Sequence, residues 1–500
     1  MGRITLINPP LLTQSDDFLG SGIPYMPYPL AYLAAELYNN KYQVEVIDSF
    51  GINPDNVYKI DNFYIQGLEV SGIINRIQPD AKYVVVYFST IMANLLIKMI
   101  IIAIKKIYPS MIVIVIENSE AVIGCSLEYI KDEIMRSGAD YIILGEPEER
   151  IISLLEVLKN KATSIKLIDG LIYKNCEGEL IVNSKNGFIK NLDKLNFPKW
   201  DLFPVENYWK LGYSHGPLES GRYLSLLTSR GCPFNCNFCI IPATNERKWR
   251  YRSPENVVSE IEYMIQHFEV YEYHLEDVNP TADEKRIIRI CELIQDKGLK
   301  IKWKLASGSK IETMSIETLE KMKRSGCNYI SFSPESGSLK VLDLMGKPFN
   351  HAYALKMSRE MNRLGIYSQA CFVLGYPGET DDDLKMTEKY VRKLTRNGID
   401  EIALFIMTPI PGTRTYGMID GFKDYSELTF SPSWREDYHK LAKFRDGLYF
   451  KFLLWKMLYH PLKVIRQFFN LLMRSFKTKS EMNIYRVFKF KWYLAKSGRK

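Results

Sequence analysis

Three cysteines lie within eight residues, Cys232, Cys236 and Cys239, in the order Cys-Pro-Phe-Asn-Cys-Asn-Phe-Cys. Thiolates are soft ligands that suit iron–sulfur clusters or zinc. A structural zinc site takes four ligands, and the next candidate along the chain, His267, lies on an expected helix. A cubane cluster held by three thiolates keeps one iron without a protein ligand, as catalytic metal sites keep a position open for a reactant. The spacing therefore favours a [4Fe–4S] cluster with one open iron, with zinc as the alternative.

The other five cysteines are scattered singly, so we expect no disulfide framework and a cytoplasmic, reducing compartment. The N-terminal residues lack the charged and apolar segments of a signal peptide. The most apolar stretch, 91–107, contains Lys98, Lys105 and Lys106, so a buried helix is expected there rather than a membrane span. With 500 residues, 46% of them hydrophobic, the chain is long enough for two or three domains.

Residues 1–160 alternate between two hydrophobic periods. Apolar runs of strand length are separated by segments of helical period, which predicts a parallel sheet with helices on both faces. The expected fold is a doubly wound, Rossmann-like α/β domain. The strands are expected at 4–7, 44–47, 83–88, 112–116 and 141–144, and the helices at 29–37, 68–77, 93–107 and 127–135.

Three further regions follow. Residues 161–220 are expected to form a packed linker that contains a hairpin at 170–183. Residues 221–415 alternate again, and six βα units predict a partial parallel (βα)6 barrel. Its strands are expected at 223–228, 271–275, 301–305, 329–333, 369–374 and 401–407, with helices such as 254–268 and 316–325. Residues 416–500 are expected to form a basic, aromatic helical region.

Polar or Gly- and Pro-rich clusters follow all six expected barrel strands. Because the carboxyl ends of parallel strands share one face, the clusters are expected to converge there. Each alone has an ordinary structural explanation, such as a solvated strand end or a turn. The clusters are the cysteine segment, Glu276-Asp277, 307–310, 334–337, 375–380 and 408–413, and the side chains expected to line the cavity include His274, Trp303, Tyr329 and Cys371.

The cysteine motif, with an aromatic residue before its third cysteine and its place after the first barrel strand, resembles the radical S-adenosylmethionine (SAM) superfamily. The acidic pair after the second strand, the segment 334–337 and the segments 372–380 and 408–413 resemble the cobalamin-binding branch of that superfamily. The resemblance implies that the three cysteines hold a [4Fe–4S] cluster whose open iron binds SAM. It also implies reductive cleavage of SAM to a 5′-deoxyadenosyl radical. The residues that the resemblance places at SAM are Phe238, Glu276, Asp277, Ser307, Glu335, Gly375 and Pro411.

The N-terminal segments Asn8-Pro9-Pro10, 29–34 and 46–48 resemble the start of the cobalamin-binding domain of this branch. Two features depart from it. Residues 1–214 contain no His, so no imidazole from this domain can ligate cobalt, and Glu117-Asn118-Ser119-Glu120 stands where a Gly-Gly pair is usual. The candidate cobalamin contacts are Ser89, Thr90 and Asn118.

Three functions are weighed. The first is cobalamin-dependent methyl transfer to an unactivated centre of a lipid or natural product, with an electron donor such as flavodoxin or ferredoxin. The second is a radical SAM reaction without cobalamin, such as cyclisation, rearrangement or oxidation, and the third is a zinc-containing nucleic-acid-binding protein. A methylthiotransferase is disfavoured, because that family carries a second cysteine triplet and only Cys125 and Cys176 precede the barrel.

The C-terminal region concentrates the positive charge. Residues 440–500 contain sixteen Lys and Arg against Asp446 and Glu481, interleaved with aromatic residues, whereas the whole chain has a net charge of +8. Three explanations remain open: a helical cap over the barrel with snorkelling cations, an amphipathic helix on an anionic membrane, or nucleic-acid contact, which is disfavoured. Pro461 is expected to divide the region into two helices.

Overall fold

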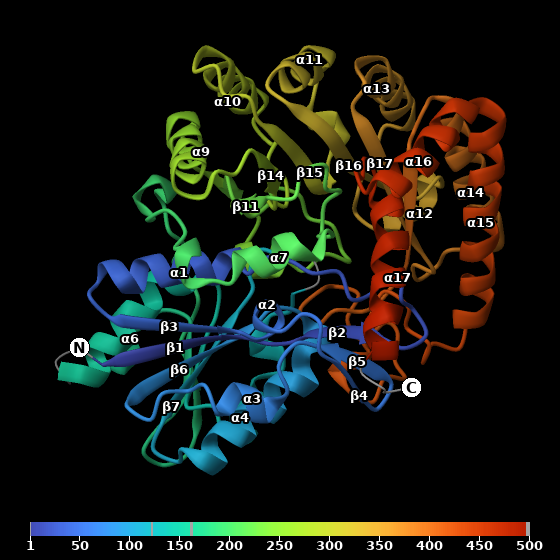
Figure 1. Ribbon diagram of the computed structural model, residues 1–500. Coiled ribbons are helices and arrows are strands. Elements are labelled where there is room, and N and C mark those ends of the chain that lie inside the picture. Colours follow the sequence, from blue (N-terminus) through green and yellow to red (C-terminus); the bar gives the residue numbers. More distant parts are fainter. Residues whose placement is uncertain (1, 122–123, 161–163, 497–500) are drawn as a thin grey trace.

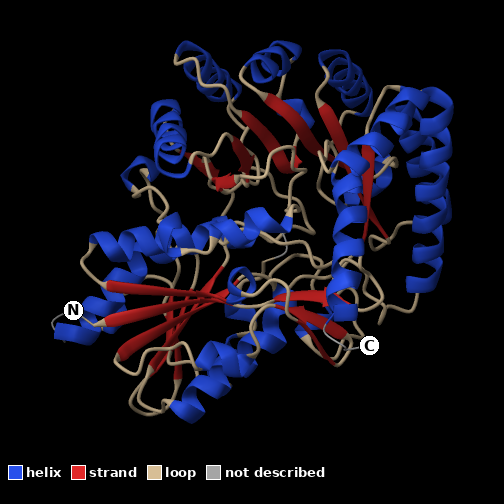
Figure 2. Ribbon diagram, in the orientation of Figure 1, coloured by secondary structure: helices blue, strands red, loops and turns tan. Residues whose placement is uncertain are grey.

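The computed structural model describes residues 2–121, 124–160 and 164–496. Two α/β units lie against each other, and helices from the C-terminal end flank both (Figure 1). Each unit has its own sheet, with most helices on the outside (Figure 2). Both expected α/β folds are confirmed.

The N-terminal sheet has seven strands in the order β10-β9-β8-β7-β6-β1-β3. The five strands β8 to β3 are parallel, and neighbours pair in register, for example Ile4 with Val44 and Val86 with Val115. Valine and isoleucine dominate these strands because both sheet faces are covered. The strands are β1 (Arg3–Asn8), β3 (Gln43–Asp48), β6 (Ala81–Phe88), β7 (Ile112–Glu117), β8 (Tyr141–Ile143), β9 (Leu171–Lys174) and β10 (Leu180–Val182).

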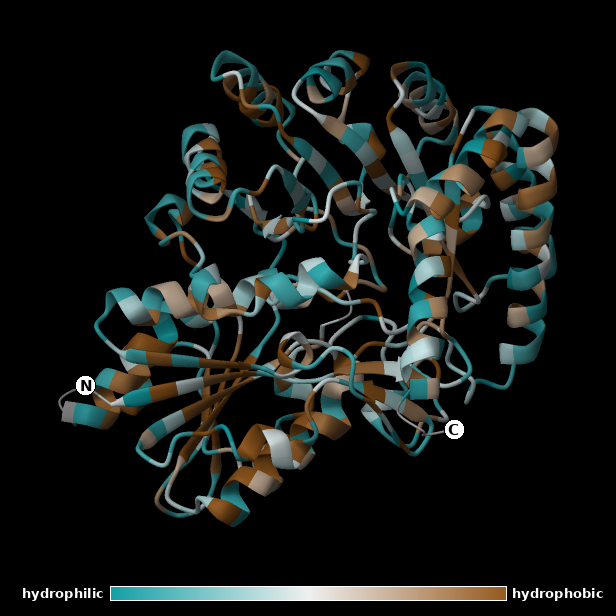
Figure 3. Ribbon diagram, in the orientation of Figure 1, coloured by the Kyte–Doolittle hydropathy of each residue, from teal (hydrophilic) through white to brown (hydrophobic). Residues whose placement is uncertain are grey.

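Helices cover the two faces of this sheet with separate apolar cores. On one face α1 (Tyr28–Asn39) packs beside α6 (Pro147–Asn160), and on the other α4 (Asn94–Ile107) packs beside α3 (Val70–Ile74). The strands are largely brown in Figure 3, because they are apolar on both sides. The helices expected at 68–77 and 127–135 are shorter than predicted. The second is split into a 3-10 turn, Leu127–Tyr129, and α5 (Lys131–Arg136), because Ile130 leaves the helical conformation.

Two parts of the N-terminal unit differ from expectation. The hairpin β9–β10 extends the sheet antiparallel to β8, so it belongs to this domain rather than to a separate linker. A three-stranded antiparallel sheet of β2 (Leu11–Gln14), β5 (Phe63–Gln66) and β4 (Val57–Ile60) was not predicted, since its strands have only four residues each. A short helix, α2 (Ser49–Ile52), leads into it.

The second unit is an open sheet of six parallel strands in sequence order, as a partial barrel requires. Its strands are β11 (Leu224–Leu226), β14 (Glu272–Leu275), β15 (Lys302–Ser309), β16 (Cys327–Glu335), β17 (Tyr367–Leu374) and β18 (Glu401–Ile406). The outer helices are α9 (Pro254–Phe268), α10 (Glu284–Asp296), α11 (Ile316–Arg324), α12 (Leu339–Leu344), α13 (His351–Leu364) and α14 (Asp381–Arg396). Serine, threonine, aspartate or asparagine side chains cap the first turns of all six helices, as for Ser253 on Asn256 N.

The C-terminal region has three long helices where two were expected: α15 (Tyr438–Tyr459), α16 (Pro461–Met473) and α17 (Lys479–Lys496). Pro461 separates the first two, as predicted, and Arg474 ends α16 in a left-handed conformation. α15 packs on α14 and β18, whereas α17 reaches the N-terminal unit at β4. In the described part of the chain, no helix combines the length and the apolar content that crossing a membrane requires.

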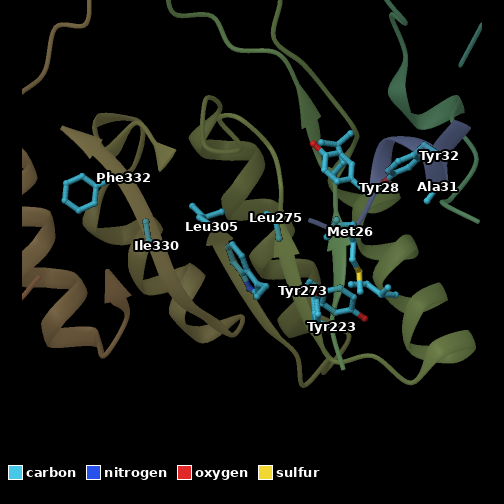
Figure 4. Close-up of a cluster of buried hydrophobic side chains, with 14 of the residues drawn as sticks. Met26, Tyr28, Ala31, Tyr32, Tyr223, Tyr273, Leu275, Leu305, Ile330 and Phe332 are labelled. Carbon is cyan, nitrogen blue, oxygen red and sulfur yellow. The ribbon is translucent and has the colours of Figure 1, made fainter. Parts of the chain in front are cut away.

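The two α/β units share one apolar core. Met26 of the N-terminal unit lies close to Leu275 and Tyr223 of the barrel, and Tyr28 and Tyr32 belong to the same buried cluster (Figure 4). A helix of the connecting segment, α7 (Val205–Leu211), adds Tyr208 to the same core. This continuous core holds the carboxyl ends of the two sheets against each other.

Candidate active site

The cysteine segment lies between two short strands, β12 (Ser229–Arg230) and β13 (Arg250–Tyr251), that pair with each other. Cys232, Cys236 and Cys239 are all half-buried. Among the described residues, no three His, Cys, Asp or Glu side chains converge on one point as ligands of a single ion do. A cubane needs no such convergence, because each thiolate binds a different iron. Three soft donors on one loop therefore fit the cluster, which would use all three thiolates.

Backbone geometry holds this segment in place. Gly231 has a left-handed φ of 77°, and a Cβ there would approach Lys248 O to 2.3 Å, so only glycine fits. Arg414, after β18, donates its backbone N–H to Asn237 O at 3.1 Å. Asn237 N in turn donates to Met345 O at 2.9 Å. The loops after three different strands thus meet at the cysteines.

The N-terminal unit contacts the cysteine segment from the other side. Glu120 accepts a hydrogen bond from Gly231 N at 3.0 Å, next to Cys232. Ser119 O accepts from Asn245 Nδ2 at 2.7 Å. Arg230, which is 4% exposed, forms ion pairs with Glu146 and Glu148. Buried charges are stable only when paired in this way, so these contacts fix the cysteine segment against the N-terminal sheet.

This arrangement explains the acidic segment at 117–120. Glu117 accepts from Leu127 N and Gly145 N, and Asn118 donates to Ser89 O at 3.1 Å. Both carboxylates of the segment are therefore occupied by neighbouring backbone N–H groups. The candidate cobalamin contacts Ser89, Thr90 and Asn118 lie together and half-buried at the carboxyl ends of β6 and β7.

Glu335 and Lys347 form a second feature beside the cysteines. Glu335 ends β16 with a φ of 63°, and its carboxylate pairs with Lys347 Nζ at 2.5 Å, with both side chains nearly buried. Lys347 also lies 6.0 Å from the ring of Phe238. Burial raises the pKa of the Cys236 thiol, while the charge on Lys347 opposes that shift. A cation at this place stabilises thiolate, the form that binds iron.

A polar cluster that was not predicted lies inside the barrel and centres on His215. Its Nδ1 lies 2.9 Å from Glu276 Oε2, and its Nε2 lies 3.3 Å from Lys479 Nζ. Tyr25 stacks on the imidazole with ring centroids 4.2 Å apart. Because ionised Glu276 can only accept, we assign the imidazole proton to Nδ1, which leaves the Nε2 lone pair facing Lys479.

The two central side chains of this cluster are buried, His215 at 8% exposure and Glu276 at 5%. Tyr25 is 40% exposed, yet burial raises its pKa. Burial also lowers the pKa of His215 and of Lys479. Lys479 donates to Ala306 O at 2.8 Å. Residues 25, 215, 276 and 479 come from four separate segments, so no local pattern could have indicated the cluster; the only prior signal was Glu276.

Of the seven residues expected at SAM, five lie at strand ends or in the cysteine segment, and two lie in the loops after β17 and β18. Glu276, Ser307, Glu335 and the half-buried Phe238 lie at the carboxyl ends of strands or in the cysteine segment, as predicted. Asp277, however, has a structural role, because its carboxylate oxygens accept hydrogen bonds from Thr228 N, Thr228 Oγ1 and Ser229 Oγ. It secures the backbone that leads into the cysteine segment.

Two predicted residues lie in loops. Gly375 has a φ of 73°, its N–H donates to Glu379 Oε2 at 2.6 Å, and its carbonyl accepts from Arg435. Pro411 follows β18 and precedes Gly412, where a Cβ would lie 3.4 Å from Ser126 in the N-terminal unit. Whether the residues expected at SAM contact it stays a prediction.

The alternation of side chains along β15 places Trp303, which was expected in the cavity, on the other face of the sheet. Trp303 points to the helix layer, where its indole N–H donates to Ser325 O at 3.1 Å at the end of α11. Cys371 lies near Ser331 Oγ at 3.4 Å, on the opposite face of the sheet. The prediction for Trp303 was therefore wrong.

A comparison with known protein families matches the part of the chain that contains the cysteine segment. Residues 226–391 match the family model of the radical SAM superfamily. The chain carries a radical SAM domain. The match begins at the end of β11, just before the cysteine segment, and ends within α14. It therefore covers the second to fifth strands of the partial barrel, β14 to β17.

Sequence similarity to known proteins extends beyond that domain. An uncharacterized methyltransferase of Pyrococcus horikoshii is 27% identical over 436 residues, covering 87% of this chain and 86% of the relative. Cytidylyl-2-hydroxyethylphosphonate methyltransferase of Streptomyces wedmorensis is 23% identical and covers 89% and 87%. The alignments include residues on both sides of the radical SAM domain.

Solved structures share the fold. The cobalamin-dependent radical SAM enzyme OxsB, with aqua-cobalamin and SAM bound, superimposes with a TM-score of 0.62 at 20% identity. That match covers 90% of this chain but 56% of OxsB. The radical SAM methyltransferase TsrM of Kitasatospora setae gives a TM-score of 0.61 at 14% identity, covering 83% and 75%. The two-domain arrangement is therefore one that known structures adopt.

Proposed function

We propose that this protein is a cobalamin-dependent radical SAM methyltransferase. The observation that carries the proposal is the position of the cysteine segment. It lies at the carboxyl end of the barrel and is hydrogen-bonded through Gly231 to Glu120 of the Rossmann-like unit. A centre at this junction is within reach of ligands on both units, as carboxyl strand ends are the usual place for cofactors.

The residues would divide the work as follows. Cys232, Cys236 and Cys239 would hold a [4Fe–4S] cluster, which when bound and reduced supplies the electron that cleaves SAM. Phe238, Glu276, Ser307, Glu335, Gly375 and Pro411 would surround SAM, whereas Asp277 would act through the backbone of Thr228. Ser89, Thr90 and Asn118 would contact cobalamin. The substrate would be a small molecule or a lipid, and flavodoxin or ferredoxin would supply electrons.

The polar cluster around His215 supports the same proposal. His215 and Lys479 place a lone pair and an ammonium inside the barrel, next to Glu276. Such groups can orient a polar substrate and hold a proton while the apolar core excludes water. We assign them a positioning role.

Anaerobic reconstitution with iron, sulfide and hydroxocobalamin tests the proposal. We expect visible absorption from both the cluster and cobalamin. We also expect 5′-deoxyadenosine from SAM after reduction. Cys236→Ala should lose the cluster and this product, while Cys176→Ala, at an exposed position in the β9–β10 turn, should keep both.

Three results distinguish the alternatives. A cluster and 5′-deoxyadenosine without bound cobalamin would support a radical SAM enzyme whose N-terminal unit is a scaffold. About one zinc per chain and no iron would support the zinc protein instead. Retained 5′-deoxyadenosine formation in Cys236→Ala would contradict the assignment of the cluster.

A further inference from the structure

Helix α16 (Pro461–Met473) is unusual because none of its residues is buried. Six of its large apolar side chains are exposed by 53 to 77%, whereas Leu471 is partly buried against the core. They recur at intervals of three and four residues, so they form one stripe along the helix. The stripe consists of Leu462, Ile465, Phe468, Phe469, Leu472 and Met473.

The opposite, polar face of α16 binds the body of the protein. Lys463 Nζ donates to Gly398 O at 2.6 Å and pairs with Asp400 at 2.8 Å. Gln467 Nε2 donates to Thr478 Oγ1 at 3.2 Å, and Asn470 donates to Glu481 at 3.1 Å. A surface helix ordinarily turns its apolar face to the core. Here specific polar contacts hold it the other way round.

The neighbouring helix α15 enlarges the apolar surface. It packs beside α16 and exposes a second stripe, and both helices carry brown bands in Figure 3. Exposed apolar faces of this extent mark interaction sites. We call the two stripes the C-terminal apolar surface; its α15 part consists of Phe450, Leu453, Leu454, Met457 and Leu458.

The charged side chains of α15–α17 indicate what kind of partner binds the C-terminal apolar surface. The exposed charged side chains of α15–α17 are almost all basic, and Asp446 is the one exposed carboxylate among the described residues of these helices. A second copy bound through the same surface would bring basic groups face to face, which is repulsive. Two of the cations pair with α14, Lys440 with Asp381 and Lys451 with Glu388. The exposed cations are Lys440, Lys443, Lys451, Arg466, Arg474, Lys491 and Lys496.

We propose that the C-terminal apolar surface is a docking site for an anionic membrane. Its aliphatic and aromatic side chains enter the boundary between headgroups and acyl chains, while the surrounding lysines and arginines contact lipid phosphates. This proposal is independent of the proposed reaction.

Flotation with lipid vesicles tests the membrane proposal. We expect the full-length protein to float with vesicles of phosphatidylcholine containing roughly one third phosphatidylglycerol, and to bind far less to phosphatidylcholine alone. High salt should weaken the binding. Removing both rings with Phe468→Ala/Phe469→Ala should lower the partition coefficient about tenfold or more. Because neither ring is buried, folding should be unchanged.

Leu167→Ala is the matched control, because Leu167 is a 76% exposed apolar residue in the N-terminal unit. It should bind vesicles like the unmodified protein. The proposal is overturned if the full-length protein does not float with anionic vesicles, or if the double variant binds as well as the parent. It is also overturned if the same double variant instead abolishes a dimer seen in solution by light scattering.

Discussion

At the scale of single residues, the site combines buried charges with strained backbone. Glu335 adopts a left-handed φ of 63°, a conformation that costs a non-glycine residue about 1–2 kcal/mol. Its ion pair with Lys347 fixes the side chain in this place, because removing one partner of a buried pair would leave an uncompensated charge. Strain of this kind collects at functional sites, where the surrounding structure over-determines it.

Glu379 predicts a pH dependence of stability. Burial raises the pKa of this carboxyl to about 7, and its Oε1 has no hydrogen-bond partner. The folded state therefore binds a proton more tightly than the unfolded chain does. Stability associated with this group is present at low pH and is lost as the pH rises from about 4.5 to about 7. Relative to the parent, Glu379→Gln should gain on the order of 1–2 kcal/mol on going from about pH 5 to about pH 8.

Urea unfolding of both proteins at the two pH values measures this difference. Asp296→Asn, at an exposed position near the end of α10, should track the parent at each pH. An equal difference between Glu379→Gln and the parent at both pH values would show that the carboxyl titrates normally.

At the scale of elements, the loop between β16 and α12 packs directly on α14. Gly337 N donates to Thr387 Oγ1 at 2.9 Å, and Ser338 Oγ donates to Asp383 at 2.6 Å. A Cβ at Gly337 would lie 2.5 Å from Met386 O and 2.6 Å from Thr387 Cα. Both obstacles are backbone atoms, so the glycine is required for close approach rather than for an unusual φ.

Gly337→Ala should therefore destabilise the protein by about 1–3 kcal/mol through this overpacking. Gly447→Ala is the matched control: it lies within α15, where a Cβ would meet nothing within 4 Å. That substitution should stabilise by about 0.5–1 kcal/mol. Thermal or urea unfolding measures both, and equal effects of the two substitutions would refute the packing argument.

At the scale of the whole molecule, the C-terminal region holds the two α/β units together. Arg486 of α17 donates to four backbone carbonyls of the N-terminal unit, those of Phe18, Leu19, Ser21 and Gly22. Asp424 pairs with Lys98 of α4 at 2.9 Å. The segment before Tyr25 thus depends on a helix more than 450 residues away in the chain.

Arg486→Met should free those carbonyls and destabilise the protein by about 2–3 kcal/mol, because hydrogen bonds to a charged donor are lost. Amide hydrogen exchange over residues 18–22 should become faster than in the parent. Lys496→Met, at an exposed position on the same helix, should leave the exchange of that segment unchanged. Unaltered exchange in Arg486→Met would mean that other contacts hold the segment.

Local patterns in the sequence were enough to predict the architecture and to single out the three cysteines. Apolar runs of strand length, separated by segments of helical period, predicted most strands of both units, and the predicted helix at 254–268 matches α9. The cysteine motif was recognisable because its three cysteines lie within eight residues of one another. Short strands such as β2, β4 and β5 escaped prediction, since four residues carry too little periodicity.

Tertiary structure decided what depends on distant partners. His215, Glu276 and Lys479 meet only because α17 returns to the barrel, and Trp303 faces the helices because strand parity follows from register. The amphipathic pattern of α16 is visible in the sequence, yet the sequence does not say which face is buried. Asp400, Thr478 and Glu481 bind its polar face, so the apolar face points outward.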